Sequence, residues 1–131
     1  MENLKKETIK KLEEVKNNLA GQTNEQNYCD MVNTMIDYDN EAQDNIYLYD
    51  SMMEHYEFID TELLEGYITS QLKDYGVERL RYILNDTYND NIYYLNAYGN
   101  LENVNDDIFK DCINEAIEQL EEAIKEESEV E

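Results

Sequence analysis

Hydrophobic residues recur at every third or fourth position along most of the chain, which is the spacing of one face of an amphipathic helix. The first such stripe predicts a helix over residues 2–20, which Gly21 ends. The stripe consists of Leu4, Thr8, Leu12, Val15 and Leu19, with Ile9 beside it. A second helix is expected to begin at Thr23, because Gln26 three positions later completes a capping box.

The second stripe is centred on Cys29, Val32 and Ile36, with Tyr28, Met31 and Met35 beside it. Residues 37–40, with the sequence Asp-Tyr-Asp-Asn, predict a break, because Asp and Asn favour turns and caps. A third helix is then expected over residues 41–58. Its inward positions are Ala42, Ile46, Tyr49, Met53 and Tyr56, although the run 46–49 also fits a short strand.

The rest of the pattern predicts three more helices and a hairpin. Asp60 or Thr61 begins a helix that ends near Gly76, with Leu64, Ile68 and Leu72 inward; a short helix follows over residues 77–84, and residues 85–91 form a loop. Residues 92–98 and 101–104 flank Gly99-Asn100 and are rich in β-forming side chains, which is typical of a hairpin. Asn105 or Asp106 begins the last helix, whose inner face is Phe109, Ile113, Ala116, Leu120 and Ile124.

These elements predict a mainly α, compact single-domain fold over residues 1–131, with five to six helices and a small β-hairpin near residues 92–104. A two-stranded hairpin is only marginally stable in water, so it should lie against the helices. Residues 126–131 are expected to fray, because acidic side chains oppose the dipole at a helix C-terminus.

The charge of the chain is strongly negative and unevenly distributed. It carries 32 acidic and 10 basic residues, for a net charge of −22, and residues 17–72 contain twelve carboxylates but no Lys or Arg. Disorder and a halophilic surface are the alternative explanations, but 41% hydrophobic residues and twelve tyrosines argue against the first, and free use of Lys near the N-terminus against the second. Such a field repels nucleic acid and anionic membranes and attracts basic surfaces.

The motifs of metal and phosphate sites are missing from the sequence. A di-iron bundle needs Glu-x-x-His on two helices, and the chain has a single histidine, His55. An EF-hand loop starting at Asp37 would need Gly at its sixth position and Glu at its twelfth, where the chain has Ala42 and Leu48. No Gly-rich phosphate loop occurs. We therefore expect no metal and no cofactor.

A catalytic role is not expected either. Cys29 or Cys112 could pair with His55 as a nucleophile, but both cysteines lie on apolar helical faces, where a thiol is inert. Both are predicted to be reduced and buried. With no signal-peptide h-region and no long apolar run, the sequence suggests a soluble, reduced, cytoplasmic protein without membrane contact. The prediction is a protein that is not an enzyme.

The tyrosines and the spacing of the carboxylates indicate a binding surface. Tyr is favoured at protein interfaces, and Tyr38, Tyr47, Tyr93 and Tyr98 lie off the cleanest apolar stripes, although packing explains any one of them more simply. Helical carboxylates three or four residues apart lie roughly 5–6 Å apart. Duplex DNA presents one phosphate per about 3.4 Å of axis on each strand, so such a helix offers a comparable line of negative charge.

In small size, extreme acidity, richness in tyrosine and lack of catalytic motifs, the chain resembles the acidic DNA-mimic inhibitors that phages and mobile elements use against host defences, the anti-CRISPR and anti-restriction proteins. The resemblance covers composition and rests on no sequence motif. It implies a non-catalytic inhibitor that binds the basic nucleic-acid channel of a defence nuclease, either a CRISPR effector or a restriction enzyme, without itself contacting nucleic acid. The alternative is an acidic phage adaptor or regulatory protein that docks a basic partner without DNA mimicry.

The contact surface is expected in the stretch that lacks basic residues, because carboxylates that repel one another cost stability unless a partner neutralises them. Its predicted members are Asp37, Asp39, Glu41, Asp44, Asp50, Glu54, Glu57, Asp60, Glu62 and Glu65. The rival surface is the last helix, with Glu115, Glu118 and Glu122.

Overall fold

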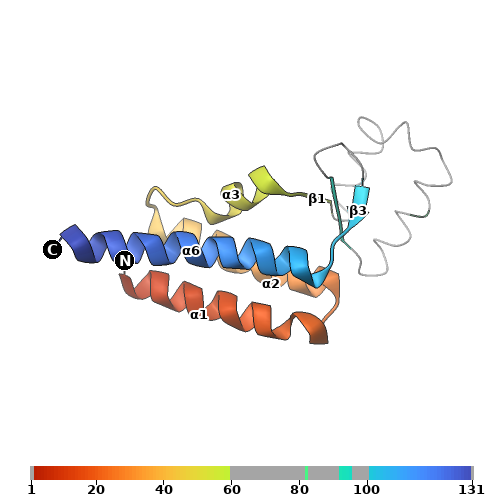
Figure 1. Cartoon of the computed structure of the whole chain (residues 1–131), viewed down its shortest axis with the longest axis horizontal. Helices are drawn as coiled ribbons and strands as arrows, with labels where there is room; N and C mark the ends of the chain where they lie inside the picture. Colours follow the sequence, from red (N-terminus) through yellow and green to blue (C-terminus); the bar gives the residue numbers. More distant parts are fainter. Residues whose placement is uncertain (1, 60–81, 83–91, 96–100, 131) are drawn as a thin grey trace.

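The computed structural model describes residues 2–59, 82, 92–95 and 101–130 of the chain (Figure 1). The described part is mainly helical and contains four α-helices: α1 (Glu2–Asn18), α2 (Asn24–Ala42), α3 (Leu48–His55) and α6 (Asp106–Val130). A short 3₁₀ turn, η1 (Leu19–Gly21), continues α1. The strands are β1 (Glu57–Ile59), β2 (Tyr93–Leu95) and β3 (Leu101–Asn103). Within these residues, no helix is long and apolar enough to cross a membrane.

Two of the helix starts predicted from capping residues, those at Thr23 and Asn105, are confirmed, and the one at Asp60 or Thr61 lies outside the described residues. The Thr23 hydroxyl accepts a hydrogen bond from the backbone N–H of Gln26 at 3.1 Å, and α2 begins at Asn24, directly after Thr23. The Asn105 side chain accepts from the N–H of Ile108 at 3.0 Å at the start of α6. Each cap satisfies a backbone donor that the first turn of a helix leaves without an intrahelical partner.

The helices α1, α2 and α6 pack lengthwise and enclose the main core (Figure 1). Lys5 contacts Glu127 and Lys16 contacts Asn114, so α1 and α6 run antiparallel and bring the two chain ends to the same end of the bundle. The predicted stripes of α1 and α6 do form the core: its innermost members there include Leu12, Leu19, Phe109, Ile113 and Leu120. Packing of these stripes holds the bundle together, because burial of each large apolar side chain contributes about 1.5–3 kcal/mol.

A three-stranded antiparallel sheet, in the order β1-β2-β3, caps one end of the bundle. The pairs Leu95↔Leu101 and Tyr93↔Asn103 confirm the hairpin predicted near residues 92–104, whose connecting residues 96–100 lie outside the description. The strand β1 was not expected, because its residues were assigned to the end of the third helix. Phe58 of β1 is fully buried and stacks on Phe109 of α6, with ring centroids 6.2 Å apart. This contact joins the sheet to the bundle.

The helix break predicted at residues 37–40 is wrong, because α2 continues to Ala42. Tyr38 is 1% exposed and extends the buried stripe of Met31 and Met35, and this tertiary packing outweighs the turn preference of the Asp and Asn beside it. The helix ends after Ala42 because its C-cap residue, Gln43, has a φ of 47°, in the left-handed region.

The third helix was predicted over residues 41–58 but spans only Leu48–His55. The turn at residues 43–47 resets the helical phase, so Leu48 and Met52 face the core. The predicted inward residues Ile46, Tyr49, Met53 and Tyr56 are half-buried, and Ala42 is buried as part of α2. The count of five to six helices also differs from the four observed in the described part. The helices predicted over 60–76 and 77–84, and the loop over 85–91, lie outside the described residues.

The two cysteines form no disulfide and have different environments. Cys112 is buried, as predicted, but Cys29 is exposed, so the prediction that both are buried is wrong for Cys29. The buried stripe of α2 is centred on Met31 and Met35 rather than on Cys29 and Ile36, which rotates Cys29 out of the core. At the other end of the chain, α6 extends to Val130, and fraying of residues 126–131 stays a prediction.

Candidate functional site

The ten carboxylates predicted as a contact surface fall into three groups. Two are held by contacts within the protein, Asp39 and Asp44. Four are described and lie in α2 or α3 or at their ends with exposed side chains: Asp37, Glu41, Asp50 and Glu54. Of the other four, Glu57 lies in β1 with a side chain outside the description, and Asp60, Glu62 and Glu65 lie outside the described residues.

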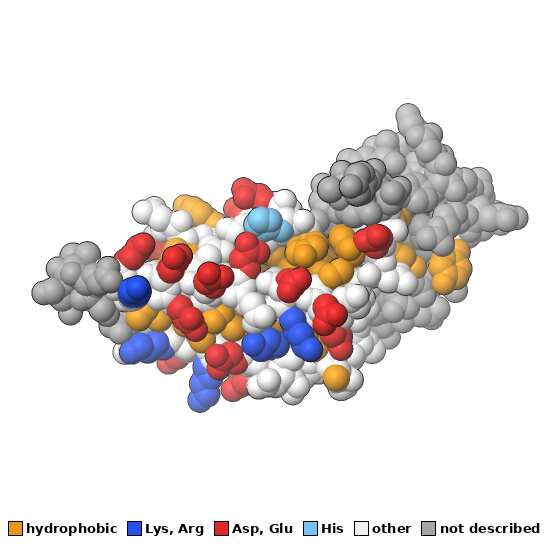
Figure 2. All heavy atoms as spheres, viewed as in Figure 1, with side chains coloured by type: hydrophobic (Ala, Val, Ile, Leu, Met, Phe, Trp, Pro, Cys, Tyr) orange, Lys and Arg blue, Asp and Glu red, His pale blue; other side chains and the backbone are white. Residues whose placement is uncertain are grey.

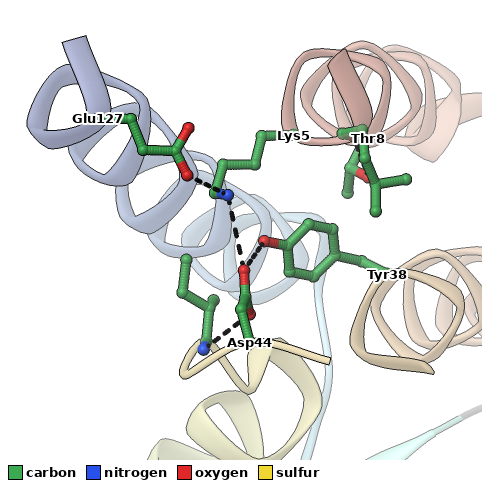
Figure 3. Close-up of polar contacts among 7 residues, drawn as sticks. Lys5, Thr8, Tyr38, Asp44 and Glu127 are labelled. Atoms are coloured by element: carbon green, nitrogen blue, oxygen red, sulfur yellow. Dashed lines mark hydrogen bonds and ion pairs between the residues drawn. The ribbon is translucent and has the colours of Figure 1, made fainter. Parts of the chain in front are cut away.

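Asp44 lies at the centre of a polar network that connects three helices (Figure 3). The ammonium of Lys5, a residue only 2% exposed, lies 2.8 Å from the Glu127 carboxylate and 3.6 Å from that of Asp44. The Tyr38 hydroxyl donates a hydrogen bond of 2.7 Å to the same Asp44 oxygen. The other Asp44 oxygen accepts from the backbone N–H of Ile46 at 3.0 Å. The network ties α1, α2, the turn before α3 and α6 to one another.

The network also sets the protonation of its members. Burial raises the pKa of the Asp44 carboxyl, but the hydrogen bonds from Tyr38 and Ile46 and the charge of Lys5 outweigh burial and hold the pKa below its ordinary value. Burial, followed by the hydrogen bond to Asp44, raises the pKa of the Tyr38 hydroxyl well above its ordinary value. At neutral pH the phenol therefore stays a donor and the carboxylate an acceptor.

Asp39 holds the start of α3 from a position on α2. Its two carboxylate oxygens accept hydrogen bonds from the backbone N–H groups of Leu48 at 2.9 Å and Tyr49 at 3.1 Å. Burial raises its pKa, the two backbone hydrogen bonds lower it, and the charges of Asp50 and Asp44 raise it again, so that the net shift is upward. This carboxylate replaces a local cap, since Tyr47 at the N-cap position makes no side-chain hydrogen bond.

The longest line of outward carboxylates in the described part runs along α6. We call it the α6 acidic row, and its members are Asp107, Asp111, Glu115, Glu118, Glu122 and Glu126. All are exposed except the half-buried Glu115. Because the members are three or four residues apart, they fall on one side of the helix, about 4.5–6 Å apart along its axis. Figure 2 shows acidic side chains along this helix, with lysine side chains mainly toward α1.

One histidine contact connects the α6 acidic row to α3. The His55 Nε2 lies 3.0 Å from the Glu115 carboxylate, and both side chains are about half exposed. The contact shows that α3 lies beside the middle of α6, and the exposed faces of the two helices therefore belong to neighbouring parts of the surface.

The chemistry of Cys112 fits a structural thiol. Burial raises its pKa to about 12, and the nearby carboxylates Glu115 and Asp111 contribute in the same direction. The thiol therefore stays protonated at neutral pH, and a protonated thiol is a poor nucleophile and metal ligand. Within the described ranges, no three His, Cys, Asp or Glu side chains come together closely enough to hold a metal ion.

The sequence reasoning missed the buried role of Lys5, although a signal was present. Lys5 lies three positions before Thr8 and continues the series Thr8, Leu12, Val15 and Leu19 on the buried face of α1. A lysine at a core position of a strongly acidic chain predicts a carboxylate partner nearby, because a buried charge without a partner is costly.

Comparison with known proteins assigns no relative to this chain. No protein family, no curated protein and no solved structure matches it.

Proposed function

We propose that the protein is a non-catalytic inhibitor that mimics DNA and occupies the basic nucleic-acid channel of a host defence nuclease. The observation that supports this proposal most strongly is the α6 acidic row, six carboxylates on one side of a single long helix. Together with the net charge of −22, it gives the protein a strong field that attracts Lys- and Arg-lined surfaces.

The dimensions of the α6 acidic row agree with those of a nucleic-acid strand. At about 1.5 Å per residue, the row from Asp107 to Glu126 extends over roughly 28 Å. One strand of duplex DNA carries about eight phosphates over that length. The row thus presents a somewhat lower density of negative charge than DNA, on a rigid support.

The four exposed carboxylates of the α2–α3 region, Asp37, Glu41, Asp50 and Glu54, extend the proposed contact surface beyond α6. Asp39 and Asp44 contribute indirectly, because their hydrogen bonds hold the turn and α3 in place. Their role in the proposal is therefore positioning rather than contact.

The test is competition with DNA at a purified target. A pull-down from lysates of defence-bearing bacteria identifies the nuclease, and titration of that nuclease with labelled DNA and this protein follows at several salt concentrations. We expect the protein to displace DNA and its affinity to fall with salt, though less steeply than that of DNA, which releases condensed counterions. Simultaneous binding with unaltered DNA affinity would contradict channel mimicry and indicate an adaptor that docks a basic partner elsewhere.

A further inference from the structure

Tyr47 and Tyr82 are the large hydrophobic side chains most exposed among the described residues, with 56% and 57% of their surfaces accessible, and Tyr47 is the one that adjoins a helix of the bundle. Of the tyrosines that lie off the predicted apolar stripes, Tyr38 and Tyr93 are buried, and Tyr98 lies outside the described residues. Tyr47 immediately precedes α3, which lies at one edge of the bundle (Figure 1). An aromatic ring in this position has a large apolar face available to a partner.

Two carboxylates share the same side of α3. Asp50 and Glu54 lie four residues apart on α3, a spacing that places both side chains on one side of the helix, and Tyr47 is the N-cap residue three positions before Asp50. Both are exposed, while Leu48 and Met52 on the opposite side are buried. We call Tyr47, Asp50 and Glu54 the outer face of α3.

The outer face of α3 is held rigidly by contacts on its inner side. The backbone N–H groups of Leu48 and Tyr49, directly after Tyr47, donate to the Asp39 carboxylate. The carbonyl of Tyr47 accepts a hydrogen bond from the N–H of Ser51 at 3.0 Å. A ring carried on a fixed backbone loses less entropy on binding than one on a flexible loop, which is the condition for an anchor residue.

From this arrangement we infer that the outer face of α3 docks an arginine side chain of a basic protein partner, with the guanidinium stacked on Tyr47 and paired with Asp50 or Glu54. Arginine fits better than lysine because its planar guanidinium both stacks on an aromatic ring and forms two parallel hydrogen bonds with a carboxylate. The inference rests on the proposed function insofar as the partner is a basic protein, and it adds the residue type that is recognised.

The test compares two peptides of equal length, one an arginine homopolymer and one a lysine homopolymer, titrated into the full chain. Backbone amide shifts of residues 47–54 in NMR spectra report a Kd for this face alone, separate from binding along α6. We expect the arginine peptide to bind the face roughly two- to fivefold more tightly than the lysine peptide. Tyr47→Ala should abolish that preference, and Tyr47→Phe, which keeps the ring, should retain it.

A matched pair of charge variants completes the test. The double variant Asp50→Asn/Glu54→Gln should weaken binding of both peptides at residues 47–54. The control Glu13→Gln/Glu14→Gln removes the same charge from exposed positions of α1 and should leave that binding unchanged. Equal affinity for the two peptides, or an arginine preference that survives Tyr47→Ala, would overturn the inference. Neither outcome affects the DNA competition, so the proposed function is tested separately.

Discussion

The turn region from Asp37 to Asp50 and the helix α6 are both rich in carboxylates, but they direct them differently. In the turn region, Asp39 and Asp44 face inward: they accept hydrogen bonds from backbone N–H groups and Tyr38, and Asp44 also forms an ion pair with Lys5. In α6, the carboxylates of the acidic row point outward along one side of the helix. The same residue types thus hold the fold in one region and form a charged surface in the other. Local charge density does not distinguish the two roles, whereas partners and exposure do.

The largest expected effect comes from reversing charge on the two outward sets. Asp111→Lys, Glu118→Lys and Glu122→Lys on α6 should reduce inhibition on the order of 100-fold, since the attraction to a basic channel is reversed along the row. The matched triple Asp37→Lys, Asp50→Lys and Glu54→Lys should also reduce it, by a smaller factor, because these charges are fewer and more scattered.

Nuclease inhibition is measured for both triple variants, and circular dichroism checks that each variant keeps its helices. If the second triple abolishes inhibition while the α6 triple has no effect, the contact surface lies in the turn region alone. If both triple variants still inhibit the nuclease as strongly as the unmodified protein, the proposed function is contradicted.

Removing the buried cation should produce the largest change in stability. Lys5→Met leaves Asp44 and Glu127 without their ammonium partner, and we expect the free energy of unfolding to fall by about 2 kcal/mol, below the range for fully buried pairs because both carboxylates are partly exposed. Urea denaturation gives the value. Lys10→Met, at an exposed position of the same helix, is the control and should change it by less than about 0.5 kcal/mol. Equal effects would show that Lys5 has no special role.

Two amide substitutions separate the inward carboxylates. Asp39→Asn should cost about 0.5–1 kcal/mol, because the single Asn oxygen can accept from only one of the two backbone N–H groups that Asp39 now satisfies. Asp44→Asn should cost about 1–2 kcal/mol, because it removes the charge that pairs with Lys5. Urea denaturation measures the free energy of unfolding of both variants. Equal losses would mean that the network around Lys5 stabilises the fold no more than the Asp39 cap of α3 does.

The same variants should differ in their response to acid. The folded pKa of Asp44 is lowered, so its stabilisation is present above the ordinary pKa near 4 and is lost as the pH falls through the lowered value. The folded pKa of Asp39 is raised, so the fold instead gains stability as the pH falls through that raised value. Asp44→Asn should therefore reduce the loss of stability as the pH falls below about 4, and Asp39→Asn should increase the loss on acidification. Denaturation curves across this range would contradict the assignment if the two variants shifted in the same direction.

The smallest effect is expected at the contact that joins the two regions. His55→Gln removes the exposed contact between His55 and Glu115, and even fully charged pairs on a surface contribute only about 0–1 kcal/mol. Stability and inhibition should both stay close to those of the unmodified protein. A loss comparable to that of Lys5→Met would mean that the position of α3 depends on His55 rather than on Asp39.

The sequence predicted those parts of the fold that depend on neighbouring residues. The start of α2 follows from Thr23 and Gln26, that of α6 from Asn105, and the hairpin from the residues around Gly99. The features it missed depend on contacts between distant residues. Tyr38 keeps α2 helical through a turn-forming sequence because it packs in the core, and β1 exists because Phe58 pairs with β2 and packs on α6.

The candidate surface was predictable in kind but not in detail. The charge of −22 indicated a basic partner, yet nothing local distinguishes Asp44, which pairs with Lys5 of the distant helix α1, from the exposed Asp50 six positions later. The α6 acidic row could be predicted from the three- and four-residue spacing of its carboxylates. The exposure of Tyr47 was not, because it follows from the phase of α3 after the turn.

The antiparallel pairing of α1 with α6 determines the order in which the protein can be assembled during synthesis. The Lys5–Glu127 contact joins residues 122 positions apart, so the hydrophobic stripe of α1 lacks its partner on α6 until α6 has been translated. At about 5–20 residues per second, α6 follows α1 from the ribosome by roughly 5–20 s. During that interval the nascent chain exposes the core face of α1, and chaperones that hold apolar helices would have their best opportunity to bind. A circular permutant that begins at Asp106 and joins Val130 to Glu2 by a short linker would remove this delay and should fold faster.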